Sequence, residues 1–117
     1  MIKYISVLAF MLTGLAGTVL AQDARLASGK ALYQENCASC HGSNLEGQAD
    51  WKIRLPNGRL PAPPHDESGH TWHHPDRVLV DIVNRGTAAI VGGGYESDMP
   101  GFGDVLSDEE VIAILDY

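Results

Sequence analysis

The first twenty residues carry the longest apolar run of the chain, which follows a single positive charge at Lys3. The run covers about 16 residues and ends at small residues, with Ala21 directly before a polar position. Such a segment is typical of a secretory signal peptide, and it is shorter than the roughly 20 residues of a membrane-spanning helix. We predict a cleavable signal peptide over residues 1–21 and one exported domain over residues 22–117. A segment that stays uncleaved would anchor the domain to the membrane.

Two later segments have the three- and four-residue spacing of apolar positions that predicts helices. The first covers residues 26–38 and contains Gly29, a weak helix former that also permits close approach of another helix. The second covers residues 75–85, with Pro75 suited to its first turn and Gly86 to its end.

A third helix is predicted at the end of the chain, because Ser107 and Glu110 have the spacing of a capping box. The chain stops at Tyr117, about three turns later, so we expect this helix to be truncated there. Residues 42–64 and the run Gly92-Gly93-Gly94 are rich in glycine or proline and are predicted to be loops.

The composition describes a small acidic domain. The chain has 117 residues and a formal net charge of −7. A domain of this size often depends on a cofactor or a covalent link for stability. Its charge argues against nucleic acid and predicts a partner with a basic docking face.

The sequence Cys37-Ala38-Ser39-Cys40-His41 carries the main chemical signal. This CxxCH spacing is the one used to attach a c-type haem through two thioethers, with the histidine as an axial iron ligand. A zinc site or a local disulfide remains as an alternative, but no second CxxC is present. The export signal also favours haem, because attachment consumes thiols that would otherwise oxidise.

Met99 is the predicted second iron ligand. It is the only methionine after residue 21, and it precedes Pro100 in a loop with glycines on both sides. A thioether ligand opposite histidine gives a haem of higher potential than two histidines would give. The rival ligands are His65, His70, His73 and His74, which could also bind copper or zinc at a peripheral site.

These features together resemble the class I cytochromes c, over nearly all of residues 26–117. The resemblance is carried by the helix leading into Cys37–His41, by Met99-Pro100, and by the final capped helix. It implies an all-α fold, a small cytochrome c fold of three to four short helices around one covalently attached haem.

The resemblance also implies several contacts. The first and last helices would cross at Gly29, with Tyr33 packing near Ile114 and Tyr117. A proline carbonyl in Ala62-Pro63-Pro64, most simply that of Pro63, would accept a hydrogen bond from the imidazole of His41. Trp72 resembles the indole that reaches a haem carboxylate in many members.

The expected function is that of a one-electron carrier, not an enzyme, between exported or membrane redox partners, with a periplasmic or otherwise exported location. Haem c would be held by Cys37 and Cys40, and its iron by His41 and Met99. One alternative is a haem protein whose open sixth site binds small ligands or peroxide. Another is a copper-handling haem protein that uses the loop over residues 65–74.

Overall fold

The computed structural model describes the backbone of residues 5–117 and the side chains of residues 17–117. Helices and irregular segments make up this part of the chain, without strands. The helices are α1 (Ile5–Asn36), α2 (Ala38–His41), the 3₁₀ turn η1 (Thr71–His73), α3 (Asp76–Arg85), α4 (Thr87–Val91) and α5 (Asp108–Asp116). The prediction of an all-α fold is therefore confirmed.

Helix α1 is longer than the sequence pattern predicted. It includes most of the predicted helix over residues 26–38 but ends at Asn36, and it also continues back through most of the predicted signal segment to Ile5. No proline interrupts this stretch, so nothing local stops the helix. Lys3, the positive charge of the predicted signal, lies outside the described residues. Among the described helices, none combines the length and apolar character needed to cross a bilayer.

The local signals at the other predicted helices were correct. Helix α3 begins after Pro75 and ends at Gly86, whose φ is 81°. At α5 the Ser107 hydroxyl accepts from the Glu110 amide at 3.3 Å, and the Glu110 carboxylate accepts from the Ser107 amide at 2.9 Å. The capping box is therefore confirmed. The short helices α2 and α4 and the turn η1 were not predicted, because so few residues leave little periodic signal.

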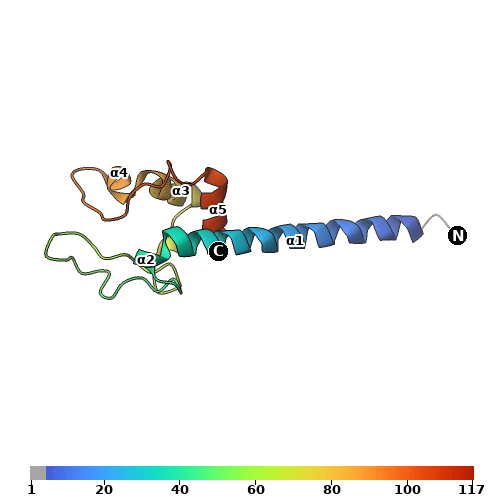
Figure 1. Cartoon of the computed structure of the whole chain (residues 1–117), viewed down its shortest axis with the longest axis horizontal. Coiled ribbons are helices and arrows are strands. Elements are labelled where there is room, and N and C mark those ends of the chain that lie inside the picture. The colour runs from blue at the N-terminus through green and yellow to red at the C-terminus, as the bar shows by residue number, and fades with distance from the viewer. Residues whose placement is uncertain (1–4) are drawn as a thin grey trace.

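The C-terminal part of α1 and helix α5 cross at the side of the folded body where α1 enters it, and the rest of α1 projects away (Figure 1). Gly29 lies at the crossing: a Cβ placed there would lie 1.8 Å from the carbonyl oxygen of Ala113. Hence the missing side chain of Gly29 lets the two backbones approach, as the resemblance implied.

The buried core forms around this crossing. Val111 is fully buried, and Tyr33, Leu106 and Ile114 are less than one-tenth exposed and pack with it. The Tyr33 and Tyr117 rings lie 5.5 Å apart. The predicted contacts of Tyr33 with the last helix are therefore present.

We predict that Gly29→Ala will lower the free energy of unfolding by about 1–3 kcal/mol, the usual cost of overpacking. Helix propensity alone would make Gly29→Ala stabilising by about 1 kcal/mol. The sign of the measured change in the free energy of unfolding therefore shows whether the close approach of the helices or helix propensity dominates at this position. Ser28→Ala, on the exposed side of the same turn, is the control and should change stability by less than about 0.5 kcal/mol. Denaturant unfolding measures both, and a stabilising Gly29→Ala would contradict the crossing.

A second prediction concerns Tyr33, whose hydroxyl donates to the carbonyl of Gly42 at 2.8 Å. Burial raises the pKa of Tyr33 from its ordinary 10.0 to about 12. The unfolded chain then releases this proton first, so the contribution of Tyr33 to stability is complete below pH 10 and is lost between pH 10 and 12. Tyr33→Phe should cost about 1 kcal/mol near neutral pH and flatten the fall of stability above pH 10. Equal alkaline slopes in denaturant unfolding of both proteins would contradict this assignment.

Candidate functional site

The two cysteines and His41 lie on the short segment formed by the junction of α1 and α2 and by α2 itself. Cys37 is the N-cap of α2, and its carbonyl accepts from the amide of His41 at 2.9 Å. This tight turn brings both thiols and the imidazole onto one short segment. Both thiols are free: Cys40 is exposed, and Cys37 is half-buried, which raises the pKa of its thiol.

The imidazole of His41 is buried, with only 7% of the residue exposed. Its Nδ1 lies 2.8 Å from the carbonyl oxygen of Pro63. A carbonyl can only accept, so Nδ1 carries the proton and Nε2 has the free lone pair. Burial lowers the pKa of His41, although the Pro63 contact opposes this shift. The ring is therefore neutral and oriented with the nitrogen that a metal can bind left available.

The position of Pro63 depends on contacts between two loop segments. Gly47 donates to the carbonyl of His41 at 2.7 Å, while Gln48 donates to the carbonyl of Ala62 at 2.9 Å. The side-chain oxygen of Gln48 in turn accepts from the Ala62 amide at 2.7 Å. Gly47 permits this approach, because a Cβ on it would lie 2.4 Å from the nitrogen of Pro64. These contacts hold the carbonyl of Pro63 beside His41.

His65 packs against His41, with ring centroids 4.1 Å apart and an interplanar angle of 30°. Its Nδ1 and the hydroxyl of Thr71 are hydrogen-bonded at 2.7 Å. Burial, together with the neighbouring His41 and His70, lowers the pKa of His65 to about 4. His65 is consequently a neutral packing partner of the imidazole at neutral pH.

Met99 lies in the loop between α4 and α5, and it is half-buried. The Thr87 hydroxyl, at the start of α4, donates to its sulfur at 3.3 Å, and the Met99 amide donates to the Ser97 hydroxyl at 3.1 Å. The loop that carries Met99 and the loop that follows α2 lie at the same end of the folded body, away from the free part of α1 (Figure 1). Both candidate iron ligands thus come from segments at one end of the molecule.

The donor set fits a c-type haem. Two free thiols can form the thioethers, while the free lone pair on Nε2 of His41 and the thioether of Met99 are ligands of the kind that hold haem iron in cytochromes c. Helix α3 agrees with this fit: none of its residues is fully buried, although it is rich in valine, leucine and isoleucine. Such a half-covered apolar face suits a flat apolar group.

The structure does not gather the four candidate copper or zinc ligands. His65 packs on His41, and His73 stacks on Trp72 with ring centroids 3.7 Å apart. The ring of His70 stacks on Trp51 at 5.4 Å and lies 5.5 Å from that of His74, so at most two of the four histidines are neighbours there. Within the part of the chain that the structure describes, no group of three or more His, Cys, Asp or Glu could hold a metal ion. The hypothesis of a peripheral metal site gains no support.

Trp72 lies in η1 and is 67% exposed, with its ring stacked on that of His73. Its role toward a haem carboxylate stays a prediction. Sequence reasoning missed the roles of His65 and Thr87, since both depend on contacts between segments distant in sequence.

Comparison with known proteins agrees with this site. The family described as cytochrome c oxidase, cbb3-type, subunit III matches residues 24–117. A curated relative, the Cbb3-type cytochrome c oxidase subunit CcoP of Azospirillum sp. (strain B510), is 27% identical over 97 residues. The alignment covers 83% of this chain but 29% of the relative, so the chain spans under a third of that protein.

No solved structure matches this chain. The family match covers the whole segment from the end of the predicted signal peptide through the CxxCH turn to the last helix. The chain therefore belongs to the family of subunit III of cbb3-type cytochrome c oxidases, and it is a c-type cytochrome.

Proposed function

We propose that this chain is a one-electron carrier that holds one haem c with His41 and Met99 as axial ligands. The observation that carries the proposal is the contact between His41 Nδ1 and the carbonyl of Pro63, directly beside two free thiols. It fixes a neutral imidazole with one nitrogen available, and such carbonyl partners are usual behind metal-bound histidines. A haem bound here supplies an iron that gains and loses one electron.

The chain's own residues make the site suited to transfer rather than to catalysis. Cys37, at the N-cap of α2, and Cys40, within α2, would fasten the group to this segment, and His41 and Met99 would fill both ligand positions of its iron. With both positions filled, no place remains for a substrate on the metal. The half-covered apolar residues of α3 would exclude water, which favours a high potential.

The partners we propose are redox proteins of an oxidase assembly. The support is the family match and the CcoP relative, whose name assigns it to a cytochrome c oxidase. The net charge of −7 favours partners with a basic docking face, because complementary charge speeds the encounter of two proteins.

We also propose that the domain is exported, with residues 1–21 as its signal peptide. The support is the apolar run after Lys3 and the small residues that end at Ala21. Intact-mass measurement of the protein from the periplasm should give a chain that begins at Gln22. A mass that includes residues 1–21 would contradict cleavage and indicate that this segment stays attached.

The thioether attachment can be tested by mass and by haem staining. The protein is made in a host with haem-attachment machinery, and its mass should exceed that of the polypeptide by one haem that resists denaturation. Replacing both Cys37 and Cys40 by Ser should abolish this covalent haem, whereas Ser39→Ala, between the two thiols, should retain it. A parent protein without covalent haem would contradict the proposal and favour a zinc site or a disulfide at the two cysteines.

The axial ligation can be tested by visible absorption spectroscopy. The oxidised parent should show a low-spin c-type spectrum with the weak red band of an iron–sulfur bond, and Met99→Ala should lose that band and become high-spin with a lower potential. Val105→Ala, at an exposed position in the same connection between α4 and α5, is the control and should keep the band. A high-spin parent would favour an open sixth site and small-ligand chemistry instead.

A further inference from the structure

The loop that carries Met99 is held unevenly on its two sides. After Met99, the amide of Phe102 donates to the carbonyl of Val83 at 2.8 Å, and Gly103 donates to Asn84 at 3.1 Å. These bonds fix the loop to the end of α3. The C-terminal side of Met99 is therefore well anchored.

The N-terminal side begins with three consecutive glycines, Gly92-Gly93-Gly94. All three have positive φ, of 68°, 60° and 81°, and a Cβ on any of them would meet no atom within 4 Å. Glycine is the residue with the largest conformational freedom. Within this side, the amide of Tyr95 donates to the carbonyl of Gly92 at 2.9 Å and the Thr87 hydroxyl donates to the Met99 sulfur at 3.3 Å. Between these two contacts, the glycine-rich segment depends on side chains from other loops to hold it.

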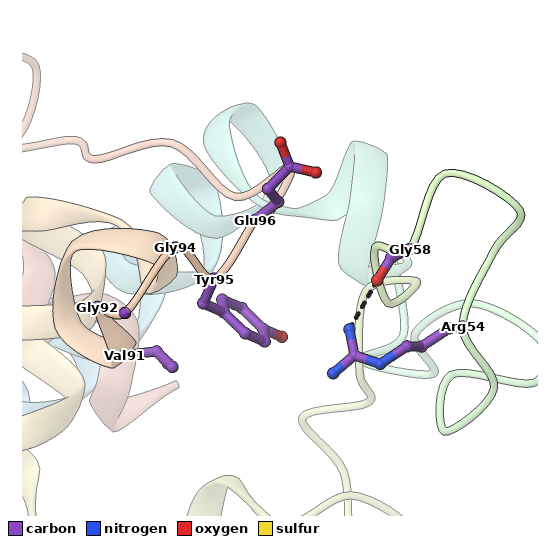
Figure 2. Close-up of a pocket in the computed structure, with 8 residues that line it drawn as sticks. Arg54, Gly58, Val91, Gly92, Gly94, Tyr95 and Glu96 are labelled. Carbon is purple, nitrogen blue, oxygen red and sulfur yellow. Dashed lines mark hydrogen bonds between the residues drawn. The ribbon is translucent and has the colours of Figure 1, made fainter.

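Two arginines from a different loop supply contacts on this side. Arg59 forms an ion pair through Nη1 with the carboxylate of Asp98, the residue directly before Met99. The guanidinium of Arg54 lies 5.8 Å from the centre of the Tyr95 ring. Figure 2 shows Arg54 and Tyr95 facing one another across an open hollow that is lined by the glycines on one side and by Gly58 on the other.

The turn that presents these arginines is itself well fixed. Leu55 donates to the carbonyl of Arg59 at 2.9 Å, and Gly58 donates to that of Leu55 at 2.8 Å. The side chain of Arg54 donates to the carbonyl of Gly58 at 2.6 Å, the dashed contact of Figure 2. The side-chain oxygen of Asn57 accepts from the amide of Arg59 at 3.0 Å. A well hydrogen-bonded turn over residues 54–59 thus faces the glycine-rich side of the Met99 loop.

We propose that the ion pair of Arg59 with Asp98 is a latch that holds the sulfur of Met99 at the haem iron. Arg59 is a positioning residue, since it acts through Asp98 and the backbone of the loop. The inference rests on the proposed ligation by Met99, and it adds a residue, distant in sequence, that sets how often the ligand detaches.

The expected effect is small, because both side chains are partly in solvent: 37% of Arg59 and 57% of Asp98 are exposed. Ion pairs of this kind change an equilibrium by about threefold. An external ligand binds only the fraction of molecules in which Met99 has detached, so its apparent affinity reports that fraction. Imidazole is a suitable probe, since it binds ferric haem iron in place of a thioether.

The experiment measures imidazole binding to the oxidised haem-containing protein through the loss of its red iron–sulfur band. Arg59→Gln and Asp98→Asn should each bind imidazole about threefold more tightly than the parent. Arg59→Asp combined with Asp98→Arg should return toward the parent affinity. High salt should raise the affinity of the parent and leave the two single variants nearly unchanged, since salt screens an exposed pair.

Arg77→Gln is the matched control, because it removes the same charge from the exposed surface of α3, where Arg77 lines a separate groove. It should bind imidazole as the parent does. An equal effect of Arg77→Gln and Arg59→Gln would overturn the latch in favour of a general charge effect. An effect of Arg59→Gln without one of Asp98→Asn would also overturn it and assign Arg59 to another partner.

The outcome also separates the latch from the proposed function. A parent that has the red band, with variants that bind imidazole as the parent does, overturns the latch and leaves ligation by Met99 in place. A parent without the band overturns both. Thermal unfolding of each variant, followed by circular dichroism, shows whether tighter imidazole binding comes from the loop or from loss of the fold. Variants that unfold at the same temperature as the parent support the latch. A general loss of helix in the variants contradicts it.

Discussion

The close crossing of α1 and α5 at Gly29 is the constraint on which the rest of the structure depends. The buried core is small and lies around this crossing, with Tyr33 on one helix and Val111 and Ile114 on the other. Cys37 follows Tyr33 by one helical turn, so the crossing also fixes the position of the first thiol relative to the core. A short domain that buries few side chains completely has little other means of positioning a site, so the backbone contact at one glycine serves both stability and function.

A second layer of contacts fixes His41 without burying much apolar surface. The loops on either side of Pro63 are joined to the segment after His41 by backbone hydrogen bonds and by the side chain of Gln48. Backbone groups in irregular loops must find partners when they are shielded from water, and here those partners are each other. The result is a polar network that sets the tautomer of one imidazole, with the His65 ring packed on the same group.

Features that depend on neighbouring residues could be predicted from the sequence. The capping box at Ser107, the stop of α3 at Gly86 and the loop character of residues 42–64 are of this kind, and the structure has all three. The crossing at Gly29 and the choice of Pro63 came from the resemblance to a family, since spacing alone does not bring distant segments together. The length of α1 and the packing of His65 and Arg59 were not predicted. The length of α1 depends on the lack of a stop signal, and the packing of His65 and Arg59 depends on long-range contacts. Neither cause leaves a periodic pattern in the sequence.

The two proposed axial ligands are therefore held by different physical means. His41 is the last residue of α2, is buried and is oriented by a hydrogen bond to a backbone carbonyl, so its position is set by the fold. Met99 lies in a loop with one anchored side and one glycine-rich side, and charged side chains of another loop contact the latter. An exposed ion pair responds to salt, while a buried hydrogen bond responds little. It follows that, of the two proposed ligands, Met99 is the one whose hold on the metal would change with solution conditions or with a charged partner docked nearby.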